Sequence, residues 1–138
     1  MALNCYPAVL FTKLAIPNFK KRGQKGNRSL ITWTSGMAAV STSKYAHLYS
    51  GTKIYTDFLA LGLEYELSGY NIDCTSWRCN GVAEQKVSDA VSADDYVKQA
   101  LNKCTSGIHY GHWYHELIGE ALEAISYVVP FIKSHYMD

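Results

Sequence analysis

Two short runs of β-branched and aromatic residues flank a long helical pattern, and they constrain the fold of this chain most strongly. The first run is residues 29–34 (SLITWT) and the second is residues 70–76 (YNIDCTS). Both have the composition of buried β-strands. Between them, over residues 49–67, apolar side chains recur at helical spacing: Ile54, Phe58, Leu61 and Tyr65. A strand, a helix and a second strand in this order predict a parallel sheet with a crossover connection.

A further helix is expected before the first strand. Residues 4–19 have an apolar helical pattern, with Pro7 near the first turn, where a proline is tolerated. Pro17 lies near the expected end, and the basic stretch that finishes in Gly23 supplies a stop.

Two helices are expected after the second strand. Ser92 and the acidic residues that follow it form a capping box for a helix to about Lys103, and a last helix covers about residues 114–127, before Pro130. The order helix, strand, helix, strand, helix, helix predicts one α/β domain over residues 1–138. No run of 18 apolar residues occurs, so no membrane span is expected.

Charge is distributed unevenly along the chain. Residues 1–56 carry eight Lys and Arg and no Asp or Glu, whereas the remainder carries five Lys and Arg against twelve Asp and Glu. A basic face meeting nucleic acid, anionic lipid or a partner subunit is one interpretation, and two halves that neutralise each other in the fold is the other. No stacking aromatic residues accompany the basic residues 20–28, so we expect no nucleic-acid binding.

The cysteines and histidines favour neither disulfides nor a metal. Four scattered cysteines are too few for a disulfide framework and indicate a reducing compartment inside the cell. Cys74 and Cys79 have poor spacing for zinc, and the histidines of residues 109–115 are spread around a helix by their three-residue spacing. We therefore expect no metal site.

Tyr49 and Lys53 form the sharpest chemical motif. At a spacing of four residues they lie on one face of a helix, which places a cation beside a phenol. A neighbouring ammonium stabilises the phenolate and lowers the pKa of the tyrosine. Such a tyrosine can act as a general acid toward a carbonyl that receives a hydride.

The context of this motif resembles the short-chain dehydrogenase/reductase superfamily. A strand that ends in residues 34–36 (TSG) is followed by residues 49–53 (YSGTK) at the start of a helix. Residues 4–17 and 55–58 look like the branch of very-long-chain 3-oxoacyl-CoA reductases and 17β-hydroxysteroid dehydrogenases, and residues 92–119 are similar to that branch's last helices.

The resemblance implies a fold and a set of catalytic residues. The fold is partial Rossmann-like, a doubly wound parallel sheet without its N-terminal cofactor-binding half. Tyr49 would be the acid and Lys53 would lower its pKa and hold the nicotinamide ribose, so these two residues are also the cofactor-binding ones. Ser35 would orient the carbonyl, and Asn4 would hold a helix kink and a proton-relay water. Ser35 lies 14 residues before Tyr49 where the family usually has 13, and Gly36 occupies the expected position.

The resemblance also implies a function and a partner. The family reduces ketones with NADP(H), here a 3-oxoacyl-CoA or a steroid ketone, but the glycine-rich turn that binds a dinucleotide is missing. We expect no NADP(H) binding and no activity from the isolated chain, and expect another protein chain to cover the exposed sheet edge. This partner is either a cofactor-half subunit or a large assembly. The alternative is a degenerate reductase that serves as an accessory subunit.

Two compartments remain open. Members of the family are typically located at the endoplasmic reticulum membrane, so the resemblance implies that this chain lies close to a membrane. The basic, acid-free residues 1–29 have the composition of a mitochondrial targeting segment.

Overall fold

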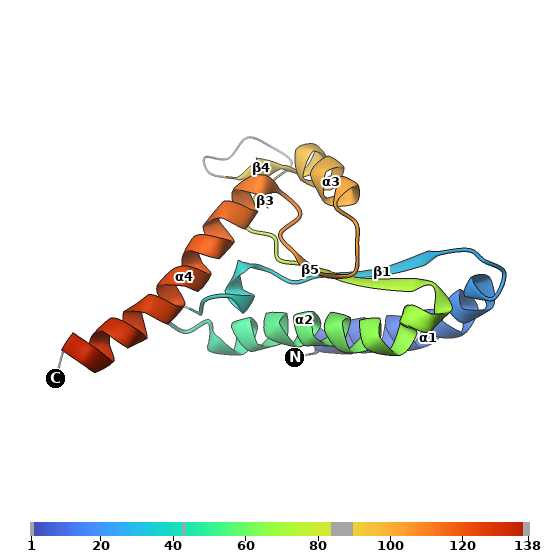
Figure 1. Ribbon diagram of the computed structural model, residues 1–138, viewed down its shortest axis with the longest axis horizontal. Helices are drawn as coiled ribbons and strands as arrows, with labels where there is room; N and C mark the ends of the chain where they lie inside the picture. Colours follow the sequence, from blue (N-terminus) through green and yellow to red (C-terminus); the bar gives the residue numbers. More distant parts are fainter. Residues whose placement is uncertain (1, 43, 84–89, 137–138) are drawn as a thin grey trace.

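A parallel three-stranded sheet organises the chain (Figure 1). The computed structural model describes residues 2–42, 44–83 and 90–136, with side chains described as far as residue 128. Strands β1 (Ser29–Thr34), β2 (Ile72–Trp77) and β5 (Gly107–His109) lie in the order β1-β2-β5. Both pairings are parallel. The chain is therefore an α/β fold.

Helices α1 (Cys5–Gly23) and α2 (His47–Leu67) lie side by side on one face of this sheet (Figure 1). A 3-10 helix, η1 (Met37–Ala39), lies between β1 and α2, and a second, η2 (Ser68–Tyr70), joins α2 to β2. The backbone of Gly23 passes so close to the Tyr70 carbonyl that a Cβ atom there would overlap it. The end of α1 therefore requires a glycine.

The remaining elements form a smaller layer beyond the other face of the sheet (Figure 1). Two short parallel strands, β3 (Val82–Ala83) and β4 (Val91–Ser92), precede α3 (Ala93–Asn102). The last helix, α4 (Trp113–Tyr136), extends away from the rest of the molecule. No helix among the described residues is long and apolar enough to cross a bilayer.

Most of the predicted elements are confirmed. Strand β1 has the predicted bounds, α2 begins two residues before the prediction, and β2 occupies residues 72–77 instead of 70–76. The expected cap is also present, because the Ser92 hydroxyl accepts a hydrogen bond of 3.2 Å from the backbone N–H of Asp95.

Two expected helix ends are wrong in detail, and one strand of the main sheet was not predicted. Pro17 lies inside α1, which continues to Gly23, and Pro130 lies inside α4, which continues to Tyr136. A proline inside a helix removes one hydrogen-bond donor, and the helix can continue past it with a local distortion. Strand β5 was not predicted, because three residues are too short to show an alternating pattern.

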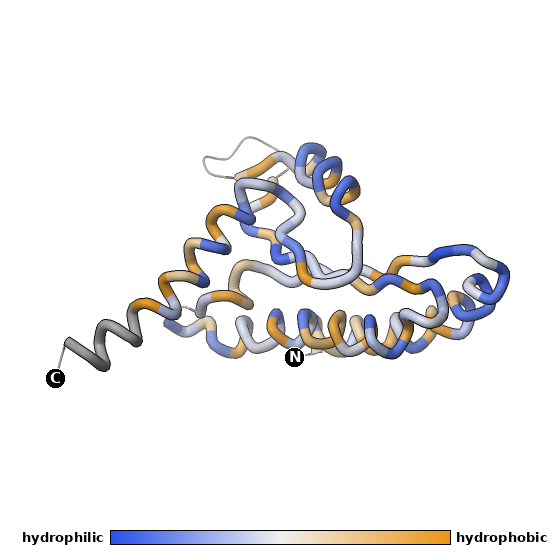
Figure 2. Tube along the Cα trace, viewed as in Figure 1, coloured by the Kyte–Doolittle hydropathy of each residue, from blue (hydrophilic) through white to orange (hydrophobic). Residues whose placement is uncertain are grey.

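The hydrophobic core is small for a chain of this size. Its buried members lie on β1, α2 and β2: Ile31, Leu67, Ile72 and Cys74. The accessible surface is 9404 Å², against roughly 7200 Å² for a compact monomer of 15.4 kDa. Figure 2 shows apolar residues along α1, α2 and α4, and many of their side chains are exposed. The chain thus exposes much apolar surface that a compact domain would bury.

The outer edge of β1 adjoins a groove. Among the described residues β1 pairs with a strand only on its β2 side. A cavity of about 550 Å³ opens between α1 and β1, and its lining includes Ala8, Phe11, Thr12 and Trp33. The hydroxyl of Thr12 is buried there and has no hydrogen-bond partner among the described residues.

Candidate active site

Tyr49 and Lys53 lie on the first turns of α2, as their spacing predicts. The Nζ atom of Lys53 is 5.5 Å from the centroid of the Tyr49 ring, and Tyr49 is 52% exposed. An exposed phenol beside an ammonium can meet a bound molecule and exchange a proton with it. The structure therefore brings together the two residues of the predicted motif.

Two hydrogen bonds join the end of β1 to α2. The Lys53 ammonium donates to the Thr34 carbonyl at 3.1 Å, and the Ser35 hydroxyl donates to the Lys53 carbonyl at 3.0 Å. The first bond fixes the lysine side chain, and the second fixes the turn of helix that carries it. The end of β1 thus holds both the side-chain ammonium and the backbone carbonyl of Lys53.

Ser35 is almost completely buried, with 1% of its surface exposed. Its hydroxyl points at a backbone carbonyl of α2, so in this arrangement Ser35 acts on Lys53 rather than on the exposed side of Tyr49. Gly36 follows in extended conformation, and a Cβ atom there would lie 3.8 Å from Cε of Lys53. The carbonyl-orienting role of Ser35 stays a prediction.

Asn4 reaches Tyr49 through one intermediate residue. Its Nδ2 donates to the Thr52 hydroxyl at 2.8 Å, and that hydroxyl donates to the Tyr49 carbonyl at 2.7 Å. Asn4 therefore links the start of α1 to the first turn of α2, whereas its role with a helix kink and a water stays a prediction. The sequence analysis did not assign Thr52 a role, although a helical threonine commonly bonds to a carbonyl one turn back.

Cys79 is a site residue that the sequence analysis missed. Its carbonyl accepts a hydrogen bond of 3.0 Å from the Met37 backbone, and its Sγ lies 3.8 Å from the Ser35 carbonyl. Burial raises the pKa of the Cys79 thiol, and the positive charge of Lys53 offsets this only in part. The thiol is therefore protonated at neutral pH and packs against the end of β1.

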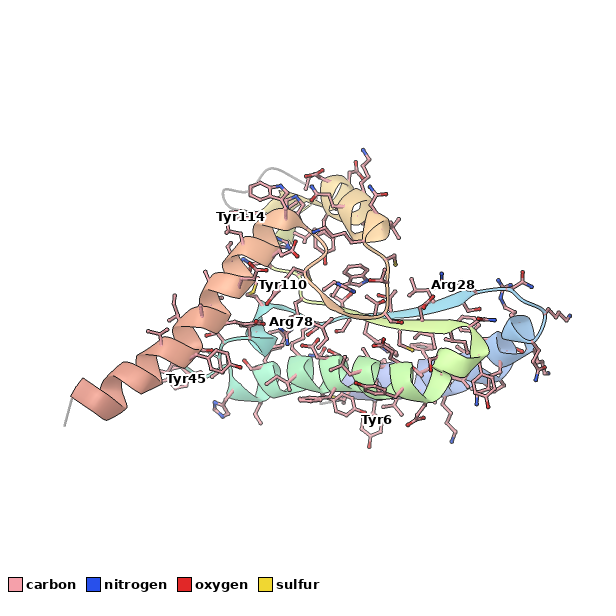
Figure 3. All side chains as sticks on the ribbon, in the orientation of Figure 1. Tyr6, Arg28, Tyr45, Arg78, Tyr110 and Tyr114 are labelled. Carbon is pink, nitrogen blue, oxygen red and sulfur yellow. The ribbon has the colours of Figure 1, made fainter. Side chains whose placement is uncertain are left out.

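A buried ion pair lies where β2 ends. Asp57 on α2 is 3% exposed and accepts hydrogen bonds from the Ser76 hydroxyl at 2.6 Å and from Nε of Arg78 at 2.8 Å. Arg78 also donates to Glu123 on α4 at 2.6 Å, and the Tyr110 hydroxyl donates to the same carboxylate at 2.8 Å. Figure 3 shows Arg78 and Tyr110 between α4 and the sheet. Arg78 thus joins α2 to α4.

The contacts around Arg78 change the pKa values of Arg78 and Tyr110. Burial alone would lower the pKa of Arg78, but its hydrogen bonds to Asp57 and Tyr110 outweigh burial and raise that pKa. Burial also raises the pKa of Tyr110, and the hydrogen bond to Glu123 adds to this effect. No cluster of three or more His, Cys, Asp or Glu that could hold a metal occurs in the described part of the chain.

Comparison with known proteins gives matches only among solved structures. No protein-family model and no curated protein matches the chain. A 3-ketoacyl-(acyl-carrier-protein) reductase from Brucella melitensis, complexed with NADH, is 19% identical, with a TM-score of 0.69 over 77% of this chain and 52% of that one. A protein from Novosphingobium aromaticivorans, described as a short-chain dehydrogenase, is 21% identical, with a TM-score of 0.70 over 98% of this chain and 48% of that one.

A third structure extends the comparison. The bulky-bulky ketone specific alcohol dehydrogenase from Comamonas testosteroni is 20% identical, with a TM-score of 0.58 over 92% of this chain and 52% of that one. The chain spans about half the length of each structure it matches. These likenesses show the fold, which is the partial Rossmann-like fold of short-chain dehydrogenases and reductases. The finer resemblance to very-long-chain 3-oxoacyl-CoA reductases stays a prediction.

Substituting Arg78 tests the buried ion pair. Arg78→Met leaves the Asp57 carboxylate buried without its cation, which should lower the free energy of unfolding by about 3–5 kcal/mol. The matched control is Arg28→Met, because Arg28 pairs with Asp73 while its side chain is 76% exposed. Loss of this exposed ion pair should lower the free energy of unfolding by about 1 kcal/mol or less. Urea denaturation measures both variants, and equal losses would contradict the assignment.

Proposed function

We propose that this chain supplies the tyrosine and lysine of a short-chain reductase that reduces a ketone with NADP(H). The ketone would be a 3-oxoacyl-CoA or a steroid. The observation that carries the proposal is the exposed Tyr49 phenol beside the Lys53 ammonium, at the carboxyl end of a parallel sheet. Ligands of open α/β sheets bind at this end of the strands. The fold shared with ketone reductases supports the same activity.

The chemistry follows from the two side chains. When bound, a nicotinamide cofactor would supply a hydride for the carbonyl carbon of the ketone. The Tyr49 hydroxyl donates its proton to the carbonyl oxygen, which gives the alcohol and leaves a phenolate. The Lys53 ammonium stabilises that phenolate, and a proton from solvent restores the phenol. The hydrogen bonds from Lys53 to Thr34 and from Thr52 to the Tyr49 carbonyl hold the pair in place.

The described residues fit one end of a dinucleotide. Lys53 and Tyr49 can contact the nicotinamide ribose, but a pyrophosphate needs a glycine-rich turn at a helix N-terminus. After β5, the only glycine in the turn is Gly111, and the Tyr114 amide at the start of α4 is already used, since it donates to His112 Nδ1 at 3.1 Å. Another segment would therefore supply the pyrophosphate site.

We propose that this segment adds a strand to the outer edge of β1. The groove of about 550 Å³ beside β1 is lined by apolar side chains of α1 and by Thr12, whose buried hydroxyl has no hydrogen-bond partner within the described residues. An added strand would pair the free edge and cover these residues. A cofactor-half chain or a subunit of a large assembly would both fit this description.

Membrane proximity is a separate proposal that rests on α4. In its described part, residues 124–128 are exposed on all sides and include Ile125, Tyr127 and Val128. Exposed apolar side chains that lie close together on a helix commonly contact protein or a lipid surface. Association of α4 with a bilayer surface would suit the endoplasmic reticulum or a mitochondrion.

An accessory, non-catalytic subunit is the second candidate function. The inward-facing Ser35 hydroxyl favours it, because that hydroxyl is occupied by the Lys53 carbonyl. The large exposed apolar surface also suits a chain that is held within an assembly. Replacing Tyr49 distinguishes the two candidates.

Tyr49→Phe should reduce ketone reduction by about 100-fold or more, because it removes the proton donor. The activity is measured as NADPH oxidation with a 3-oxoacyl-CoA, using the natively purified assembly. The matched control is Tyr55→Phe, the same change at a residue of α2 that is 37% exposed. Full activity in both variants, with unchanged assembly, would favour the accessory subunit.

Substitutions on α1 test the proposed strand partner. Phe11 lines the groove and is 69% exposed, whereas Leu14 is 64% exposed and is not one of the lining residues. Phe11→Asp should lower recovery of the partner at least tenfold in affinity purification of the tagged chain, and Leu14→Asp should not. Equal recovery with both variants would place the partner elsewhere.

A further inference from the structure

A buried aromatic cluster joins α3, α4 and the segment that follows β2. His115 at its centre is completely buried. Its ring centroid lies 5.4 Å from that of Tyr96 on α3 and 5.5 Å from that of His112, which caps α4. The cluster lies outside the candidate active site but adjoins it through residues 79–81.

One hydrogen bond fixes the state of His115. Its Nδ1 accepts from the Asn80 backbone N–H at 3.3 Å, so the proton of the neutral ring is on Nε2. Nε2 has no hydrogen-bond partner of ordinary geometry among the described residues. A second proton on Nδ1 would face the Asn80 N–H and abolish this hydrogen bond.

The groups around His115 do not compensate a positive charge. The Asp95 carboxylate on α3 lies 3.0 Å from Nε2 of His112, so it faces the His112 ring instead of the His115 ring. The Tyr96 hydroxyl is buried and has no hydrogen-bond partner in the described part of the chain, and the Tyr114 ring centroid lies 6.3 Å from that of His115. Cys79, which interacts with Tyr96, carries a protonated thiol.

These surroundings favour the neutral ring. Burial lowers the pKa of His115, the neighbouring His112 lowers it further, and the Gly81 backbone opposes the shift only in part. The unfolded chain therefore binds a proton more readily than the folded cluster does. The stability that neutral His115 contributes is present above pH ~6.5 and is lost as the pH falls toward the lowered value.

The Asn80 bond connects the cluster to the candidate site. Asn80 follows Cys79, whose carbonyl and thiol contact the Met37 and Ser35 backbones beside Lys53. The Arg78 backbone N–H, one residue earlier, donates to the His109 carbonyl at 2.7 Å and anchors the segment to β5. Loss of the His115 bond would remove the contact that holds Asn80 to α4, in the stretch between this anchor and β3.

We propose that His115 is a pH-sensitive latch: neutral, it holds the Cys79–Gly81 segment between α4 and the candidate site, and its protonation releases that segment. The latch does not depend on the proposed reductase activity, because it is defined by a backbone hydrogen bond. Its physical effect is local opening of residues 79–83 under mildly acidic conditions.

Hydrogen exchange tests the latch. Protection factors for residues 79–83 are compared between pH 7.5 and pH 5.5, in the chain as it is and in His115→Asn. The Asn side chain offers an oxygen near the place of Nδ1 but cannot take up a proton. In the wild type, protection should fall by up to ~10-fold per pH unit below pH ~6.5. In His115→Asn it should stay constant.

Two further measurements make the outcome decisive. His112→Asn keeps an acceptor for the Tyr114 amide and leaves His115 titratable, so the pH dependence should persist. A proton NMR titration of the wild-type His115 ring should give a midpoint below ~6.5 even if His115→Asn does not fold. A midpoint at or above ~6.5, or the same pH dependence in wild type and His115→Asn, would overturn the proposal.

Discussion

The candidate site depends on two hydrogen bonds between the end of β1 and the second turn of α2. Lys53 donates to the Thr34 carbonyl, and Ser35 donates to the Lys53 carbonyl, so strand and helix hold each other in one register. Without these hydrogen bonds, the Lys53 side chain would sample many rotamers, and its ammonium would be close to Tyr49 for only part of the time. Here, the strand end fixes the cation beside the exposed phenol.

A second polar network lies where β2 ends. The Asp57 carboxylate is buried, and Ser76 and Arg78 both donate to it, while Arg78 also reaches Glu123 on α4. These contacts connect α2, β2 and α4 where the hydrophobic core is small. Apolar burial therefore holds together the sheet and its two covering helices, and hydrogen-bonded charges add to the buried His115 cluster in positioning α4.

Local sequence patterns were sufficient for β1, for α2 and for the Ser92 cap, because each depends on neighbours along the chain. They were also sufficient to place Tyr49 beside Lys53, since four residues make about one helical turn. The link from Asn4 through Thr52 and the contact of Cys79 with Ser35 join residues far apart in sequence. A single sequence contains no signal for such pairings, nor for the three-residue strand β5.

In the function proposed here, this chain holds the proton donor of a reductase and another segment completes its dinucleotide site. The most direct test is calorimetric titration of NADPH into the isolated 138-residue chain and into the assembly purified natively from its source. The account predicts no saturable binding to the isolated chain and micromolar or tighter binding to the assembly. Micromolar binding to the chain alone, or none to the assembly, would contradict it.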